Sequence, residues 1–489
     1  MGLLKSVPVR LKPRSPPKGD INKQPQGLKW LLMGHFGEAF AHYGMRNILI
    51  LFMLGHLRLP DSVCYELFSA FTMLIYAVPV LGSAMGDRLG RAQDRVLASL
   101  LFMILGYVLL TLSSSTFYLA LGTLICGSGL YKPSVYTLLA YLYPAENSNR
   151  DSGYNLFLVS SNLGGVFGTL LAGYVARFYG WRFGFAFSLL GIALSLFAFS
   201  LARAKNIFPF KKNSASSLPQ RTFSPFLLLI ACPLLAFLLL KQTLINGFVL
   251  LLSFSAIAFM TSVIWKSKPA ERGKLGAVLA TIILVIIFET LFEQIGGSLN
   301  IFIERFADKR LGGVEIPTAW FLAINPTLVI LLGLFFSAVW LRLARSPYNP
   351  TALTKFLLGF GCLAGGFLIF ITSIKGISSQ GEIKGIFMAT GIFFLTLAEL
   401  FIIPTSLAVL SSLAPKPYLS TFTGGWFLAV ALAQYLAGMF AQALSAPTHS
   451  ASSLSAWDYM NLFEGLLLLA LATIAILFLL RPFLRALRT

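Results

Sequence analysis

Apolar segments of about 20 residues, each long enough to span a bilayer as a helix, recur along the whole chain. A segment that is apolar on every face excludes a soluble surface helix. Only 11% of the residues are charged, against about 25% in soluble domains. We therefore predict an all-α polytopic membrane protein. Its spans are expected near residues 28–54, 65–85, 95–113, 116–143, 153–178, 182–202, 225–241, 244–265, 275–303, 316–343, 353–374, 383–412, 418–445 and 457–481.

These fourteen segments fall into groups of six, two and six. Two halves of six helices are typical of transporters that are built from structural repeats. The predicted units are a cytosolic tail at 1–27, an N-terminal six-helix bundle at 28–202, a basic linker with two extra transmembrane helices at 203–274, and a C-terminal six-helix bundle at 275–489. The tail lacks the apolar core and cleavage site of a signal peptide.

The basic residues predict the orientation. Most of the 38 Lys and Arg lie in the tail, in alternate loops and at the C-terminus, so the positive-inside rule places both termini in the cytosol. The net charge of +20 thus reflects topology and a lipid bilayer partner, and not nucleic acid. The four Cys are dispersed, and their spacing indicates neither a metal site nor a disulfide framework.

The first apolar segment carries ionisable residues at helical spacing. His35, Glu38, His42 and Arg46 follow one another at intervals of three, four and four residues, so their side chains share one helical face. An ionisable group inside a bilayer costs about 3 kcal/mol on insertion scales and persists where it faces a wet cavity or a partner. This polar stripe is expected to line a solute pathway, with His35 and Glu38 in proton coupling and with His42, Arg46 and the adjacent Tyr43 in substrate binding.

The same segment resembles a known family. YGMR at Tyr43 to Arg46 is similar to the end of the first-helix signature of proton-dependent oligopeptide transporters, a family of the major facilitator superfamily. The family pattern is E-x-x-E-R-F followed by Y-Y-G-M-R. This chain retains the second Glu as Glu38, but His35 replaces the first Glu and Ala39 replaces the motif Arg. The resemblance implies the major facilitator fold, and the two extra helices are similar to those of prokaryotic members, which implies a bacterial inner membrane.

The loop after the second segment carries a superfamily motif. GSAMGDRLGR resembles the G-x-x-x-D-R-x-G-R loop, with Gly82, Asp87, Arg88 and Arg91 at the matching positions. Glycine permits close approach of helices, and the charged residues are expected to hold one gating state. A merely solvated loop is the alternative.

The fourth and fifth segments supply two further candidates. Lys132 lies near mid-membrane, where an ionisable residue indicates function; snorkelling to the interface is the alternative. Its surroundings, GSGLYKP, resemble the family's fourth helix, in which a Lys faces the cavity and helps to hold the peptide. RDSGYNLFLVSSNLGG resembles the fifth-helix motif, and Asn162 matches its binding-site Asn.

The segment at 275–303, the first of the C-terminal six, holds two carboxylates one turn apart, Glu289 and Glu293. Both cannot easily be ionised at that spacing, so the pair is expected to share a proton; a structural hydrogen-bonded pair is the alternative. Glu293 matches the family's F-E-Q, whose Glu is thought to carry protons and to pair with the motif Arg. Since that Arg is Ala39 here, Glu293 is expected to lack this partner, and His35 or His42 to supply part of the relay.

The remaining matches lie in the C-terminal half. Asn325 matches the eighth-helix Asn, Glu399 matches the tenth-helix acid that partners a substrate amine or the fourth-helix Lys, and Trp426 is expected to form a cavity wall. A lone Trp is otherwise an interfacial anchor.

Two functions are consistent with these residues. The first is a monomeric secondary transporter that imports di- and tripeptides with protons by alternating access. A zwitterionic peptide needs a cation, which Arg46 and Lys132 provide, and an anion, which Glu399 provides. The second is a diverged member that moves another solute, an amino acid or a peptide-like metabolite, without obligatory protons. No nucleophile–base set, phosphate loop, metal cluster or cofactor motif indicates an enzyme.

Overall fold

The computed structural model describes residues 24–85, 91–143, 149–208, 230–343, 346–347, 349–376, 382–414, 419–444 and 454–481. Among them, ten helices meet both the length and the hydropathy required to cross a membrane. Three further helices, α1, α4 and α8, are equally long. All of these lie at positions where the sequence predicts a span, which confirms the all-α membrane fold.

The first bundle packs around α1. Its helices are α1 (Leu28–Gly55), α2 (Asp61–Met85), α3 (Ala92–Leu112), α4 (Phe117–Leu142), α5 (Arg150–Tyr179) and α6 (Trp181–Ala204). Helix α1 contacts both α5 and α6, while α4 contacts α2 and α3. Glycine makes the α1–α5 contact possible, because a Cβ at Gly168 would lie 2.0 Å from the carbonyl oxygen of Phe40.

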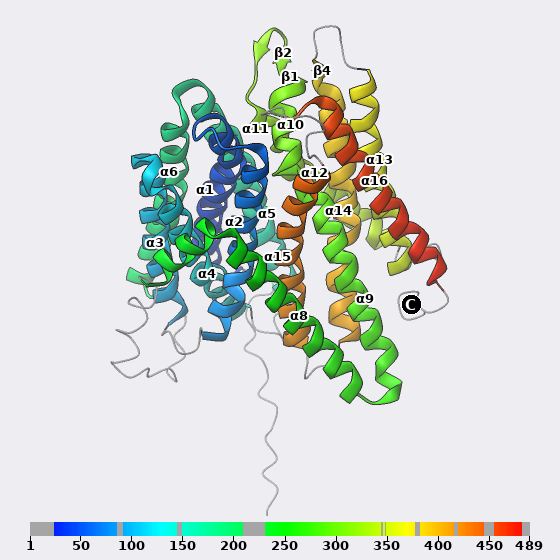
Figure 1. Cartoon of the computed structure of the whole chain (residues 1–489). Helices are drawn as coiled ribbons and strands as arrows, with labels where there is room; N and C mark the ends of the chain where they lie inside the picture. The colour runs from blue at the N-terminus through cyan, green and yellow to red at the C-terminus, as the bar shows by residue number, and fades with distance from the viewer. Residues whose placement is uncertain are drawn as a thin grey trace, which may run out of the picture.

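The two inserted helices lie outside the bundles. They are Ile230–Leu240 and α8 (Gln242–Lys266). The first meets α4 closely, since a Cβ at Gly122 would lie 2.5 Å from the carbonyl oxygen of Cys232. Helix α8 contacts α9 and α15 of the second bundle and α2 of the first, and Figure 1 shows it running obliquely beside the junction of the bundles.

The second bundle differs from the expectation in two places. Its helices are α9 (Pro269–Phe292), α10 (Ser298–Phe306), α11 (Thr318–Leu322), α12 (Ile324–Leu343), α13 (Ala352–Lys375), α14 (Gly385–Leu413), α15 (Leu419–Leu444) and α16 (Ala456–Leu479). The predicted span 275–303 is interrupted by a 3-10 turn at Glu293–Ile295 and by Gly297. The predicted span 316–343 is divided at Ala323.

Four short strands cap one end of the second bundle. β1 (Ala307–Asp308) pairs in parallel with β4 (Ile383–Lys384), so it joins the end of α10 to the start of α14. β2 (Arg310–Leu311) pairs with β3 (Val314–Glu315) around Gly312 and Gly313, whose positive φ angles of 59° and 85° suit glycine. We call this the strand end, and the opposite end, where residue 24 lies, the tail end; the two are at the top and bottom of Figure 1.

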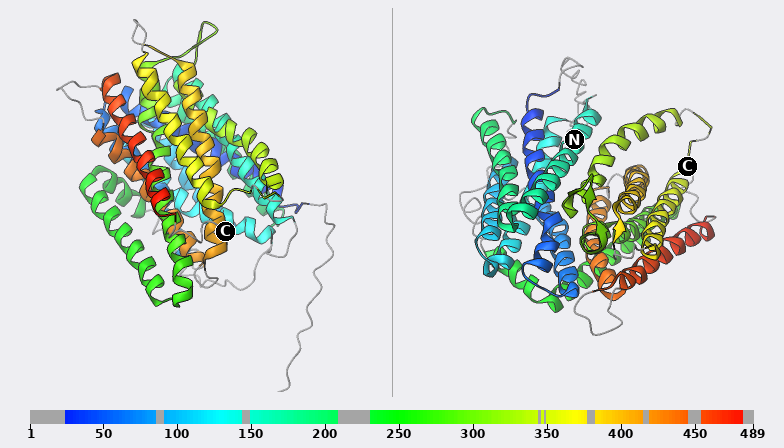
Figure 2. Two further views of the ribbon diagram at one scale, coloured as in Figure 1. Left: turned by 90° about the vertical axis from the view of Figure 1, so that its right-hand side faces the viewer. Right: turned by 90° about the horizontal axis from the view of Figure 1, so that it is seen from above.

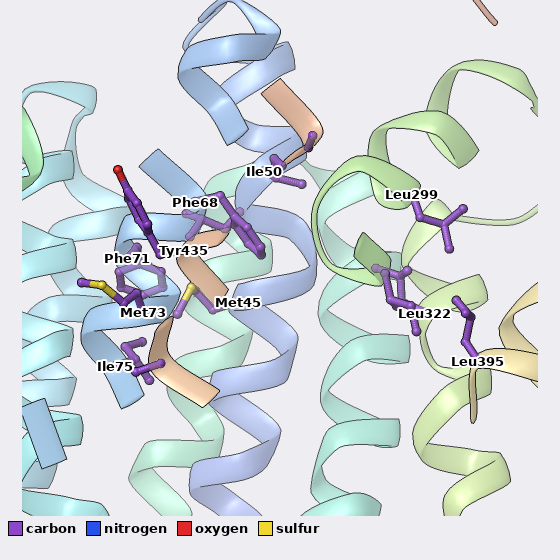
Figure 3. Packing of buried hydrophobic residues seen from close by; sticks show 14 of the residues in the cluster. Met45, Ile50, Phe68, Phe71, Met73, Ile75, Leu299, Leu322, Leu395 and Tyr435 are labelled. Carbon is purple, nitrogen blue, oxygen red and sulfur yellow. The ribbon is translucent and has the colours of Figure 1, made fainter. Parts of the chain in front are cut away.

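The two bundles meet mainly through α2 with α15 and α5 with α12 and α11. Seen from above in Figure 2, they lie side by side as two groups of roughly parallel helices. The apolar core continues across their interface. Figure 3 shows buried side chains from both bundles in one field, including Met45, Phe68, Leu299 and Tyr435. The division into units at 28–202, 203–274 and 275–489 stays a prediction.

Candidate functional site

A cavity of about 270 Å³ lies between the bundles near the middle of the helices. It combines charged and amide side chains with aromatic and aliphatic walls, as ligand pockets do. Eight of the predicted site residues line it: Tyr43, Arg46, Asn162, Glu289, Glu293, Asn325, Glu399 and Trp426. Both bundles therefore contribute polar groups to one site.

Across this cavity, Glu293 has a charged partner other than the motif Arg that Ala39 replaces. The Arg46 guanidinium forms an ion pair with the Glu293 carboxylate. Both side chains are only 10% exposed, so water screens the pair weakly. The 3-10 turn that follows α9 begins at Glu293. Ala39 replaces the motif Arg, but Arg46, which lies on α1 two turns after Ala39, provides Glu293 with a guanidinium partner.

On the second bundle, Glu399 is held by an amide. The Asn325 side chain donates hydrogen bonds from Nδ2 to the Glu399 carboxylate at 2.9 Å and to the Thr396 hydroxyl at 3.1 Å. Trp426 donates from its indole N–H to the Ser406 hydroxyl at 3.1 Å, which fixes its ring in the cavity wall. These bonds orient two of the predicted binding residues without blocking the cavity.

Lys132 lies beside the cavity and does not line it. Its ammonium is 4.0 Å from the centroid of the Tyr76 ring, a cation–π distance, and Tyr76 lines the cavity. In the described part of the chain Lys132 forms no ion pair with Glu399. The predicted bridge between these two residues is thus open in this conformation.

His35 and Glu38 form a second polar group on α1, nearer to the tail end. The His35 ring stacks on Phe157 of α5 with centroids 3.8 Å apart. Its Nδ1 lies 3.9 Å from the Glu38 carboxylate, too far for a hydrogen bond, and this nitrogen has no other partner among the described residues. His42 contacts the edge of the Tyr43 ring. Neither histidine lines the cavity.

Between the cavity and the strand end, the two bundles are joined by polar contacts that were not predicted from the sequence. Arg305 of α10 donates two hydrogen bonds, 2.6 and 2.7 Å long, to the Asp61 carboxylate at the start of α2. Beside them, the Tyr65 and Tyr459 hydroxyls are 2.9 Å apart. Asp61 and Arg305 fall just outside the predicted spans, so mid-membrane depth gave no signal for them.

The superfamily motif is described in part. A Cβ at Gly82 would lie 2.2 Å from the carbonyl oxygen of Gly129, so glycine is needed where α2 crosses α4. Arg91 precedes α3. Asp87 and Arg88 lie outside the described residues. No group of three potential metal ligands occurs among the described His, Cys, Asp and Glu residues.

Comparison with known proteins identifies the family of the chain and finds related transporters. The POT family model matches residues 94–457. The chain is 27% identical over 448 residues to a Bacillus subtilis (strain 168) protein named Uncharacterized transporter YclF, covering 87% of this chain and 90% of that protein. It is 27% identical over 447 residues to the peptide transporter YePEPT of Yersinia enterocolitica, covering 85% and 87%.

Solved structures resemble the fold over almost the whole chain. A peptide transporter POT in complex with sulfate has a TM-score of 0.81 at 22% identity, covering 95% of this chain and 96% of that one. A POT family transporter in complex with 5-aminolevulinic acid has a TM-score of 0.81 at 23% identity, covering 94% and 97%.

Proposed function

The chain belongs to the POT family of membrane transporters, and from this we propose that it imports di- and tripeptides together with protons by alternating access. Support comes from the relatives that are named as peptide transporters. The observation that carries the proposal is the cavity between the bundles, which has a cation from the first bundle and an anion from the second. One chain supplies the whole cavity, so we propose that the monomer is the working unit.

A zwitterionic peptide fits this arrangement of charge. Its carboxylate would bind Arg46 and its amine would bind Glu399, while the Asn162 and Asn325 side chains can hydrogen-bond its amide groups. The volume lies near the lower end of the range for ligand pockets, about 300 to 1,000 Å³, which favours a short peptide. A ligand bound at both ends ties the bundles together, as alternating access requires.

The conformation favours access from the tail end. The strand end is closed by the Asp61–Arg305 pair. On α5, Leu158 lies one turn from the cavity residue Asn162 toward the tail end, and it is 58% exposed. We propose that the tail end faces the cytosol, since the sequence segments that connect the helices on this side are the ones rich in Lys and Arg, and that the state is inward-facing in a bacterial inner membrane.

The Arg46–Glu293 pair offers a route to proton coupling. While Glu293 is ionised, it occupies the guanidinium that the peptide carboxylate needs. A proton on Glu293 removes this competition, so binding of the proton and of the peptide would support each other. Glu289, one turn away, and the group formed by His35 and Glu38 are further candidates for proton binding.

A second candidate function is transport of another small amino-containing solute, without obligatory protons. The loss of the motif Arg at Ala39 favours it, and a related transporter has been solved in complex with 5-aminolevulinic acid. Such a solute also carries an amine and a carboxylate, so the same cavity residues would hold it.

Counterflow in proteoliposomes tests the proposal. Vesicles loaded with unlabelled dialanine should accumulate labelled dialanine, and an inward proton gradient should raise uptake without preloading. Counterflow with no response to the gradient would leave peptide transport and remove proton coupling. Absence of dialanine counterflow, together with counterflow of 5-aminolevulinic acid, would establish the second candidate instead.

A further inference from the structure

Glu289 is a carboxylate without a protein partner in the cavity wall. It lies on α9, one helical turn before Glu293, and it is only 8% exposed. In the described part of the chain no hydrogen bond or ion pair engages its side chain.

The other charged side chains of the cavity already have protein partners. Four charged residues line it, namely Arg46, Glu289, Glu293 and Glu399. Arg46 is paired with Glu293, and Glu399 accepts a hydrogen bond from Asn325. A zwitterionic peptide would supply one amine for Glu399 and one carboxylate for Arg46. Glu289 would then still lack a cation.

An isolated buried carboxylate is costly, because removal from water is repaid only by a partner of opposite charge. The apolar walls of the cavity suit a long cationic side chain. Phe292, Ile403 and Trp426 also line the cavity. Such apolar surfaces cover the methylene stem of a lysine or arginine while its charged head reaches a polar group, and an aromatic face adds a cation–π contact.

We propose that Glu289 binds a cationic group on the substrate's side chain, so that the transporter prefers peptides that contain lysine or arginine. This inference rests on the proposed function, since it assigns a substrate class to the same cavity. A proton is the other positive partner that Glu289 could take. The two roles differ in one respect: only the first makes affinity depend on the charge of the substrate side chain.

Binding to the purified full-length protein tests this. The dissociation constants of Ala-Lys and Ala-Gln, two peptides of similar size, are compared by calorimetry at one pH, so the readout does not need proton-driven transport. A charge-assisted contact predicts that Ala-Lys binds about tenfold more tightly. Glu289→Gln should bring the ratio of the two constants close to one, and Glu289→Asp should keep part of it. Glu464→Gln, a carboxylate on α16 that does not line the cavity, should keep the wild-type ratio.

A wild-type ratio of one would overturn the inference while leaving peptide binding intact. An unchanged preference in Glu289→Gln would also overturn it, and would leave a proton as the partner of Glu289. If neither Ala-Lys, Ala-Gln nor dialanine binds to the wild-type protein, the proposed function itself fails.

Discussion

The Arg46 guanidinium on α1 and the Glu293 carboxylate at the end of α9 form an ion pair that joins the two bundles beside the cavity. The pair is a tertiary contact between residues 247 positions apart in the chain. Its two members have different proposed tasks, substrate binding for Arg46 and proton binding for Glu293. A substitution of Arg46 should therefore alter proton binding, and a substitution of Glu293 should alter substrate binding.

Glu293→Gln should uncouple uptake from the proton gradient. The amide cannot take up or release a proton, so the gradient-driven component should fall to the background rate, whereas counterflow of dialanine should persist. Uptake is measured at pH 6 outside and pH 7.5 inside and compared with counterflow at equal pH, which separates the gradient-driven component from exchange of dialanine. Gradient-driven accumulation at the wild-type level would remove Glu293 from the coupling mechanism.

Lys132→Ala should abolish proton-driven uptake while the protein remains folded in the membrane. The ammonium stacks on Tyr76, which lines the cavity, so its loss removes both a cation and the support of a cavity wall. Monodisperse elution in detergent would establish folding. Lys241→Ala, at the turn of the inserted pair, is the matched control and should transport normally. Wild-type rates in Lys132→Ala would exclude a role for this residue.

His35→Gln should make transport insensitive to pH while retaining peptide binding. An ionised Glu38 carboxylate favours the imidazolium form of His35, whereas burial opposes it. If the carboxylate prevails, His35 gains positive charge as pH falls through the range in which histidine ordinarily takes up a proton. Transport by the wild-type protein should then rise toward acidic pH. His42→Gln tests the other histidine in the same way. Unchanged pH profiles in both variants would mean that the two side chains only support the packing of the bundle.

Asp61→Asn should open the strand end. Loss of one member of a largely buried ion pair costs about 3 to 5 kcal/mol, and this cost falls on the closed state alone. Spin labels at His56→Cys and Val314→Cys, both exposed positions, would report longer distances. Glu315→Gln breaks the exposed Arg177–Glu315 pair at the same end and should change little. Equal distance distributions in the two variants would contradict a gating role for Asp61.

The sequence predicted the helices well, because long apolar segments have few alternatives in a membrane. The expected first and last spans, 28–54 and 457–481, differ from α1 and α16 by at most two residues at either end. The break at Glu293 was missed, since hydropathy continues without interruption through Glu289 and Glu293 to α10. At the 3-10 turn Gly296 packs against Arg46 and Phe68 of the first bundle, a tertiary contact that hydropathy does not report.

Eight of the residues that line the cavity were named from the sequence, but their contacts with one another were only partly expected. Mid-membrane charge identified Arg46, Glu289, Glu293 and Glu399, because each such residue is too costly to occur without a purpose. Their partners depend on how α1, α9 and α14 cross, and no spacing within one helix contains that information. For this reason the loss of the motif Arg at Ala39 could be read from the sequence, whereas the pairing of Glu293 with Arg46 could not.

The parallel pairing of β1 with β4 links two sites that lie far apart in the molecule. It joins the end of α10, where Arg305 clamps Asp61, to the start of α14, which carries Glu399 in the cavity. Glu399 is 14 residues along α14, roughly 20 Å at 1.5 Å per residue. If α10, the β1–β4 pair and α14 move as one rigid unit, binding of substrate at Glu399 and breaking of the Asp61–Arg305 pair are thermodynamically linked. The factor by which bound substrate favours the open strand end must then equal the factor by which opening raises the affinity for substrate.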